Sequence, residues 1–140
     1  MKILLGQNND ISGYINFGIR KNLSEVIEDS SCDEILAQKY LDFIEPKSFD
    51  ETVSMLCKKL KPSGKLILTG TDLFSIANLL VDGIMTLEQY RTAIYGDDSV
   101  PSRFICWTID DVCKRLVANG VLVTEKFYNG SEFVIVGRKS

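Results

Sequence analysis

The first residues that could do chemistry stand where a short apolar run breaks at a glycine. The chain opens MKILLGQNND, so Gly6, Gln7 and Asn8 directly follow an apolar segment. A glycine after a buried strand lets the backbone approach a ligand closely, because it has no Cβ and accepts a positive φ. The pattern therefore predicts a strand over 2–5 that ends either in a ligand-binding loop or in an ordinary turn.

Other polar residues stand beside the strands that the pattern predicts. Gly18 follows a second apolar segment, Asp29 and Ser30 form a polar turn ahead of a third, and Gln38 follows that third segment. Carboxylates, hydroxyls and amides all hydrogen-bond polar ligands. The alternative interpretation is that these residues are only turns and strand ends, where polar residues are expected in any protein.

The composition excludes several kinds of chemistry. The 140 residues contain no histidine, which excludes imidazole acid–base chemistry and most catalytic zinc sites. The four cysteines, Cys32, Cys57, Cys106 and Cys113, have no CxxC spacing and lie in apolar or helical stretches. We therefore expect reduced structural thiols and no bound metal. Any catalysis would use carboxylates, Tyr, Lys, Cys or positioning alone.

Charge and hydropathy limit the partners. The net charge is −3, the sequence pI is near 5.0, and the basic residues are scattered, which does not support a nucleic-acid partner. No apolar stretch approaches the ~20 residues of a membrane span, and the opening apolar run is too short for a signal peptide. We expect a cytoplasmic protein with one domain over 1–140 and no membrane partner.

Hydrophobic periodicity predicts alternating strands and helices. Strands are expected over 2–5, 13–17, 32–37 and 65–70, and helices over 48–60, 73–80, 86–94 and 108–119. The expected N-caps of these helices are Ser48 with Glu51, Thr71 or Asp72, Thr86, and Thr108. Strands over 121–128 and 132–137 flank Asn129-Gly130, a strong hairpin signal. The chain is thus expected to form an α/β sheet that closes on an antiparallel pair.

Several segments match one known family in order and spacing. Lys2–Gly6 matches the family's first strand and glycine loop, and Gly13–Asn16 matches its approach to strand two. Glu28–Ile35 matches its acidic turn before strand four, and Leu60–Leu68 matches its turn entering strand five. The chain resembles class I S-adenosylmethionine (SAM)-dependent methyltransferases, of the small kind predicted in bacteria and phages. The resemblance covers nearly the whole length. It implies a Rossmann-like three-layer sandwich with a mostly parallel sheet and a C-terminal antiparallel hairpin.

The resemblance also implies where the cofactor would lie. Its SAM-binding positions correspond to Gly6, Gln7, Asn8, Gly18, Asp29, Ser30 and Gln38. In the family a second glycine follows the first, and an acidic residue at the end of strand two holds the ribose hydroxyls. Here Asn8 stands at the second glycine and Gly18 at the carboxylate. The segment 19–27 is also too short for the helix and strand that the family inserts, so we expect a sheet shortened near strands two and three.

These departures favour a methyltransferase-like protein with a degenerate SAM site, acting as a non-catalytic scaffold or interaction subunit. An active small SAM-dependent methyltransferase stays open as an alternative, because methyl transfer from a sulfonium needs little beyond positioning. A nucleotide- or metabolite-binding module at the carboxyl ends of the strands is a further alternative. The missing strand leaves an unpaired sheet edge, which predicts a homo-oligomer or a protein partner. A phage origin would also allow association with the virion.

Overall fold

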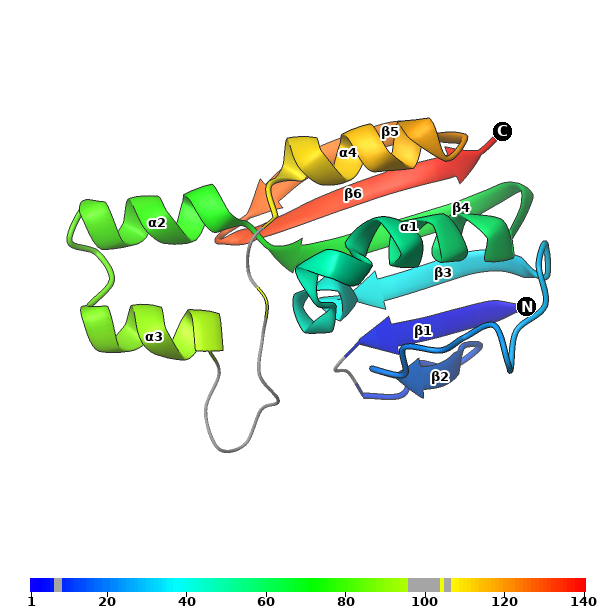
Figure 1. Cartoon of the computed structure of the whole chain (residues 1–140), viewed down its shortest axis with the longest axis horizontal. Helices are drawn as coiled ribbons and strands as arrows, with labels where there is room; N and C mark the ends of the chain where they lie inside the picture. The colour runs from blue at the N-terminus through cyan, green and yellow to red at the C-terminus, as the bar shows by residue number, and fades with distance from the viewer. Residues whose placement is uncertain (7–8, 96–103, 105–106) are drawn as a thin grey trace.

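A six-stranded sheet in the order β2-β1-β3-β4-β6-β5 forms the body of the protein (Figure 1). The computed structural model describes residues 1–6, 9–95, 104 and 107–140. β1 to β4 run parallel to one another, β6 is antiparallel to β4, and β5 is antiparallel to β6. The strands are β1 (Lys2–Gly6), β2 (Ile15–Gly18), β3 (Cys32–Gln38), β4 (Leu60–Thr71), β5 (Val121–Asn129) and β6 (Glu132–Lys139).

Four α-helices and two short 3-10 turns connect the strands. They are η1 (Tyr40–Phe43), η2 (Pro46–Ser48), α1 (Phe49–Lys59), α2 (Leu73–Val81), α3 (Leu87–Tyr95) and α4 (Ile109–Ala118). The expected caps are confirmed at Asp72, which accepts from the Ser75 N–H, at Thr108, and at Thr86. The cap expected at Ser48 is wrong. That residue has ψ near 2° rather than the extended backbone of an N-cap, and its side chain makes no capping bond.

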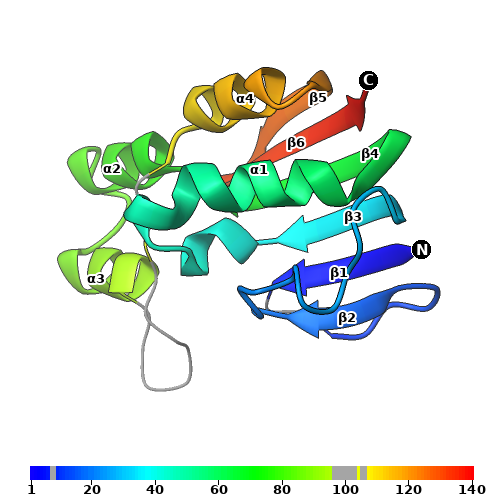
Figure 2. The same ribbon diagram turned by 45° about the vertical axis from the view of Figure 1, so that its right-hand side comes forward.

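One face of the sheet packs against helices. α1 and α4 lie side by side over this face (Figures 1 and 2). Alternate strand residues point toward them and are buried because the strand period is two. The buried residues on this face and on the two helices include Ile35, Leu66, Leu68, Ile135, Val53, Leu56, Val112 and Leu116. Beside β1 and β2, Leu23 and Ile27 from the irregular segment 19–31 complete this core.

The opposite face carries no helix among the described residues. Strand register places Leu36, Ile67 and Val136 in one row across it, and all three are only half-buried. At β1, where Leu4 is fully buried, Lys2 Nζ lies 5.7 Å from the centre of the Tyr14 ring, so the segment 9–14 covers that edge. The mostly parallel, Rossmann-like sheet with its C-terminal hairpin is therefore confirmed. The third layer differs from the expected layer of helices. The part of it that lies in the described residues is coil and not helix.

The predicted shortening of the sheet is also confirmed. Residues 19–31 form neither a helix nor a strand, and β1 lies between β2 and β3 with no further strand beyond β2 in the described ranges. β4 begins at Leu60 rather than at Lys65 as expected, because Ser63-Gly64, predicted as a turn, is an irregularity within the strand, with Ser63 at φ 65°. No helix within the described ranges has the length and apolarity needed to cross a membrane.

Candidate functional site

The carboxyl ends of β1, β2 and β3 bring Gly6, Gly18 and Gln38 together. Gly6 pairs with Gln38, and its neighbour Leu5 pairs with Gly18, so three of the sequence-predicted site residues lie at one edge of the sheet. Gly6 has φ 102°, and a Cβ built on it would lie 1.8 Å from the backbone oxygen of Gln38. Only glycine fits here, because both the backbone conformation and the space exclude a side chain.

Gly18 ends β2 and offers no side chain to a ligand. Its N–H donates to Asn16 Oδ1 at 2.8 Å, and Asn16 Nδ2 donates to Asp10 Oδ1 at 3.0 Å. A Cβ on Gly18 would meet no atom of the described residues within 4 Å, so among these residues the position has room for an acidic side chain but does not carry one. Gly18 therefore presents no side chain to the sugar of the SAM that the resemblance implies. Gln7 and Asn8 lie outside the described residues.

The residues that follow Gln38 turn inward and hold the fold. Lys39, at φ 55°, donates its N–H to Thr69 O at 2.9 Å. The Tyr40 hydroxyl donates to Arg20 O at 2.7 Å. Burial raises the pKa of Tyr40 to about 12, so its hydroxyl stays protonated at neutral pH and is not a catalytic base.

Two buried aspartates at the same end of the sheet were not predicted as a pair. Asp42 accepts from the N–H and the hydroxyl of Thr71 at 3.1 and 2.8 Å. Asp72 accepts from Ser75 N and Oγ at 2.9 and 3.0 Å and from Ile109 N at 3.2 Å. These carboxylates are occupied by neighbouring donors and fix the turns after β3 and β4. The sequence signals only the cap at Asp72, since Asp42 reads as one more polar residue after a strand.

The grouping of Asp29 and Ser30 with the glycines is corrected by the structure. Both residues lie ahead of the amino end of β3, whereas Gln38 ends that strand. A seven-residue strand spans roughly 20 Å, so one SAM-sized site cannot include both ends through these residues. Ser30 donates its N–H to Lys58 O, and Asp29 pairs with Lys59 Nζ at 2.8 Å. Asp29 and Ser30 therefore tie β3 to the end of α1.

Replacing Asp29 with asparagine tests this structural role. The hydrogen bond and charge of Lys59 hold the pKa of Asp29 below its ordinary value of 3.8. Since the folded pKa is the lower one, the stabilisation is present above the unfolded pKa and is lost as pH falls through the folded pKa. Urea unfolding should show Asp29→Asn less stable than wild type at pH 7, with the two curves converging below about pH 3. A difference that persists in acid would contradict the ion pair as its cause.

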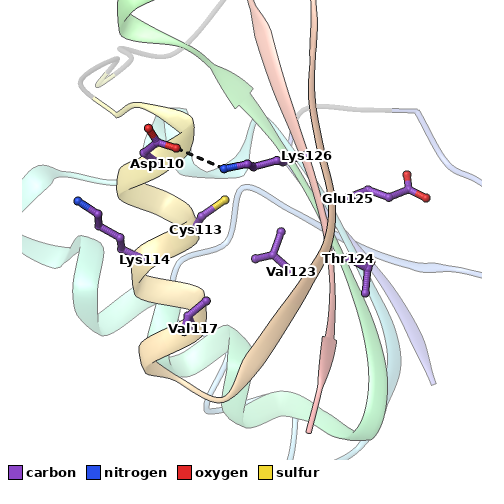
Figure 3. A pocket seen from close by; sticks show the side chains of 8 residues that line it. All are labelled: Asp110, Cys113, Lys114, Val117, Val123, Thr124, Glu125 and Lys126. Carbon is purple, nitrogen blue, oxygen red and sulfur yellow. Dashed lines mark ion pairs between the residues drawn. The ribbon is translucent and has the colours of Figure 1, made fainter.

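A cavity of about 690 Å³ lies elsewhere, between α4 and the edge strand β5 (Figure 3). Cys113, Val117 and Val123 line its apolar part, and an ion pair of 3.5 Å joins Lys126 Nζ to Asp110 Oδ1 across it. Burial raises the pKa of the Cys113 thiol, which makes it a weaker nucleophile. Among the described residues no group of three or more His, Cys, Asp or Glu is arranged to hold a metal.

The sheet order and the antiparallel C-terminal pair define the fold class, which is that of SAM-dependent methyltransferases. No protein-family model matches the sequence, and no curated protein matches it. Among solved structures the chain is similar to a SAM-dependent methyltransferase from Methanosarcina mazei, with 19% identity and a TM-score of 0.64 over 99% of this chain and 92% of that one. A putative S-adenosylmethionine-dependent methyltransferase from Listeria monocytogenes gives 14% identity and a TM-score of 0.63 over 94% of this chain and 71% of that one.

A third similar structure is the 1,6-didemethyltoxoflavin-N1-methyltransferase from Burkholderia thailandensis with bound S-adenosylhomocysteine. It shares 13% identity and a TM-score of 0.56, over 91% of this chain and 50% of that one. The chain spans only 59% of a similar protein from Pyrococcus horikoshii and 36% of an O-methyltransferase family protein from Burkholderia thailandensis. At these identities the likeness establishes the fold. The chain has a methyltransferase-like fold.

Proposed function

We propose that this methyltransferase-like chain has a degenerate SAM site and serves as a non-catalytic scaffold or interaction subunit, of the small kind seen in bacteria and phages. The observation that carries the proposal is Gly18 at the end of β2, where it pairs with Leu5, the residue before Gly6 in β1. Hydrogen bonds to a charged group contribute roughly 1.5–3 kcal/mol each. Without the carboxylate, affinity for the cofactor's sugar falls by roughly one to two powers of ten.

The segment after β1 supports the same proposal. In nucleotide-binding α/β folds the loop after the first strand leads into a helix whose N-terminal N–H groups receive the ligand's negative groups. Here residues 9–14, the described part of the connection from β1 to β2, contain a turn and no helix. The described part of the site therefore lacks both the anion that would hold the sugar and the helix end that would hold an acidic group.

Titration calorimetry with SAM on wild type, Gly18→Asp and Gly18→Asn tests the proposal. Asp and Asn are the non-glycine residues that best tolerate positive φ, and no atom in the described part of the chain lies within 4 Å of the new Cβ. Wild type and the uncharged Gly18→Asn control should show no saturable heat up to about 1 mM SAM, and Gly18→Asp should bind at least about 10-fold more tightly than Gly18→Asn. Micromolar binding by wild type contradicts the proposal.

One observation favours an active SAM-dependent methyltransferase as the second candidate. The Asp10 carboxylate is joined through Asn16 to the Gly18 N–H, so an acidic group lies two hydrogen bonds from the end of β2. In this account Asp10 replaces the missing carboxylate. Asp10→Asn should then abolish any SAM binding that wild type shows, whereas the degenerate-site proposal expects no binding in either protein.

A further inference from the structure

The hairpin formed by α2 and α3 projects beyond the carboxyl ends of the strands (Figure 1). Ile76 is the one buried residue of α2, and α3 has none. Large apolar side chains along the hairpin are 53–82% exposed: Phe74, Val81, Ile84, Leu87 and Tyr95. Two nine-residue helices are too short to be stable by themselves, so a hairpin of this kind needs a surface to pack on.

The sheet face opposite α1 and α4 is the second uncovered apolar surface. Its row of Leu36, Ile67 and Val136 reaches the edge strand β5 at Glu125. On either side of Glu125 on this face, Leu122 is 67% and Phe127 is 48% exposed. Parallel sheets are almost always covered on both faces, usually by helices. The part of the chain that the structure describes thus has a helix pair without a sheet and a sheet face without helices.

The two surfaces match in size. A nine-residue helix is about 13 Å long, and two packed helices cover about 20 Å across. The uncovered face spans four strands, β3, β4, β6 and β5, which is about 15 Å between the outer strands. One hairpin therefore covers most of one open face.

Their charges also match. Figures 1 and 2 show the turn between α2 and α3 at the end of the hairpin farthest from the sheet. Asp82 and Glu88, both exposed, flank this turn. At the amino ends of the parallel strands, one row across the open face holds Lys65 paired in register with Arg138. Lys2 and one acid, Glu34, lie further along this row. The hairpin turn is acidic, and the far end of the sheet face is basic.

We propose that two copies of this chain associate by exchanging arms, so that the α2–α3 hairpin of each copy covers the open sheet face of the other. A two-fold axis perpendicular to the strands, placed where the hairpin leaves the sheet, relates the two contacts. It brings the acidic turn of one copy to the basic row of its partner. A second copy is the occupant that covers both uncovered surfaces at once, whereas a different partner on one of them would leave the other exposed.

The buried area is that of a stable dimer. Each hairpin-on-sheet contact has a flat footprint of about 13 by 15 Å on each of its two surfaces, which amounts to about 800 Å² over both contacts. Because an accessible surface is about twice as large as the flat area beneath it, the two contacts bury on the order of 1,500 Å² in total, which is standard for specific interfaces. The inference deepens the proposed scaffold function and rests on it for its biological role. The contact differs from the edge pairing expected from the sequence, which would use the edge strand β2, because arm exchange uses a sheet face and a helix pair.

Multi-angle light scattering on the intact protein and on two charge-reversed variants tests the proposal. Wild type should have twice the 15.7 kDa mass of one chain. The arm variant Asp82→Lys/Glu88→Lys and the sheet variant Lys65→Glu/Arg138→Glu should each be monomeric and folded by circular dichroism, because each places like charges in contact. An equimolar mixture of the two variants should recover the dimer, because positive arms then meet negative sheets and negative arms meet positive sheets.

Three results would overturn the inference: a monomeric wild type at about 100 µM, dimeric single variants, or a mixture of variants that stays monomeric. A monomeric sheet variant separates arm exchange from hairpin-on-hairpin pairing, in which its unaltered hairpins would still pair. Because the readout is mass, it is independent of SAM binding. The assembly can fail while the degenerate-site proposal stands, and the reverse also holds.

Discussion

Gly6→Ala is expected to lower the free energy of unfolding by about 3–5 kcal/mol or to prevent folding. The new Cβ would lie 1.8 Å from a backbone oxygen, that of Gln38, at a position with φ 102°. β1 and β3 cannot move apart to make room without losing the strand pairing that joins them within the sheet. The expected loss is thus a property of the fold and does not depend on whether a ligand binds.

Gly13→Ala is the matched control for this variant. Gly13 also has a positive φ, 90°, but a Cβ there would meet nothing within 4 Å. It should cost only the strain of the backbone conformation, about 1 kcal/mol. Urea unfolding of both variants measures the difference, and equal losses would contradict the close approach of β1 and β3 as the reason for Gly6.

Asp72→Ala is expected to cost about 2–4 kcal/mol, the second large effect. Losing the cap of α2 contributes about 1 kcal/mol, and leaving the Ile109 N–H without its partner in a buried place adds about 1–3 kcal/mol. The variant therefore weakens the ends of two helices at once. Thermal unfolding followed by circular dichroism should show a lowered midpoint with the fold retained.

Thr108→Ala and Ser75→Ala are the controls for Asp72. Thr108 caps α4 alone, so its loss should cost about 1 kcal/mol. Ser75→Ala removes the hydroxyl bond to Asp72 but keeps the N–H that the carboxylate caps. If Asp72→Ala were no more destabilising than Thr108→Ala, the link that Asp72 makes between α2 and α4 would have no energetic role.

The sequence predicts the order of strands and helices well because the signals are local. The apolar run to Leu5, the caps at Asp72 and Thr108, and the hairpin near Gly130 each depend on neighbouring residues. The hairpin turn itself is shifted by one residue, since Asn129 pairs with Glu132 and leaves Gly130 and Ser131 as the connection. The short segment 19–27 predicts the missing strand, because chain length limits what can form there.

The arrangement of polar residues is less predictable, because it depends on which strand ends meet. The resemblance groups Asp29 with Gly6, but these residues lie at opposite ends of the parallel sheet, and only strand direction reveals it. Asp42 carries no local signal, since its partner Thr71 is 29 residues away. The uncovered sheet face is equally hidden in the sequence, because half-buried Leu36 and Ile67 have the alternation of any covered strand.

The sheet end formed by Gly6 and Gly18 is expected not to hold SAM, and amide NMR measures this at the site itself. In ¹H–¹⁵N spectra, glycine amides are resolved from most others, so both residues can be followed as SAM is added. The account predicts that their signals keep their positions up to about 1 mM SAM, while those of the Gly18→Asp variant move in a saturable way. Saturable shifts of both amides in wild type at micromolar SAM would contradict it.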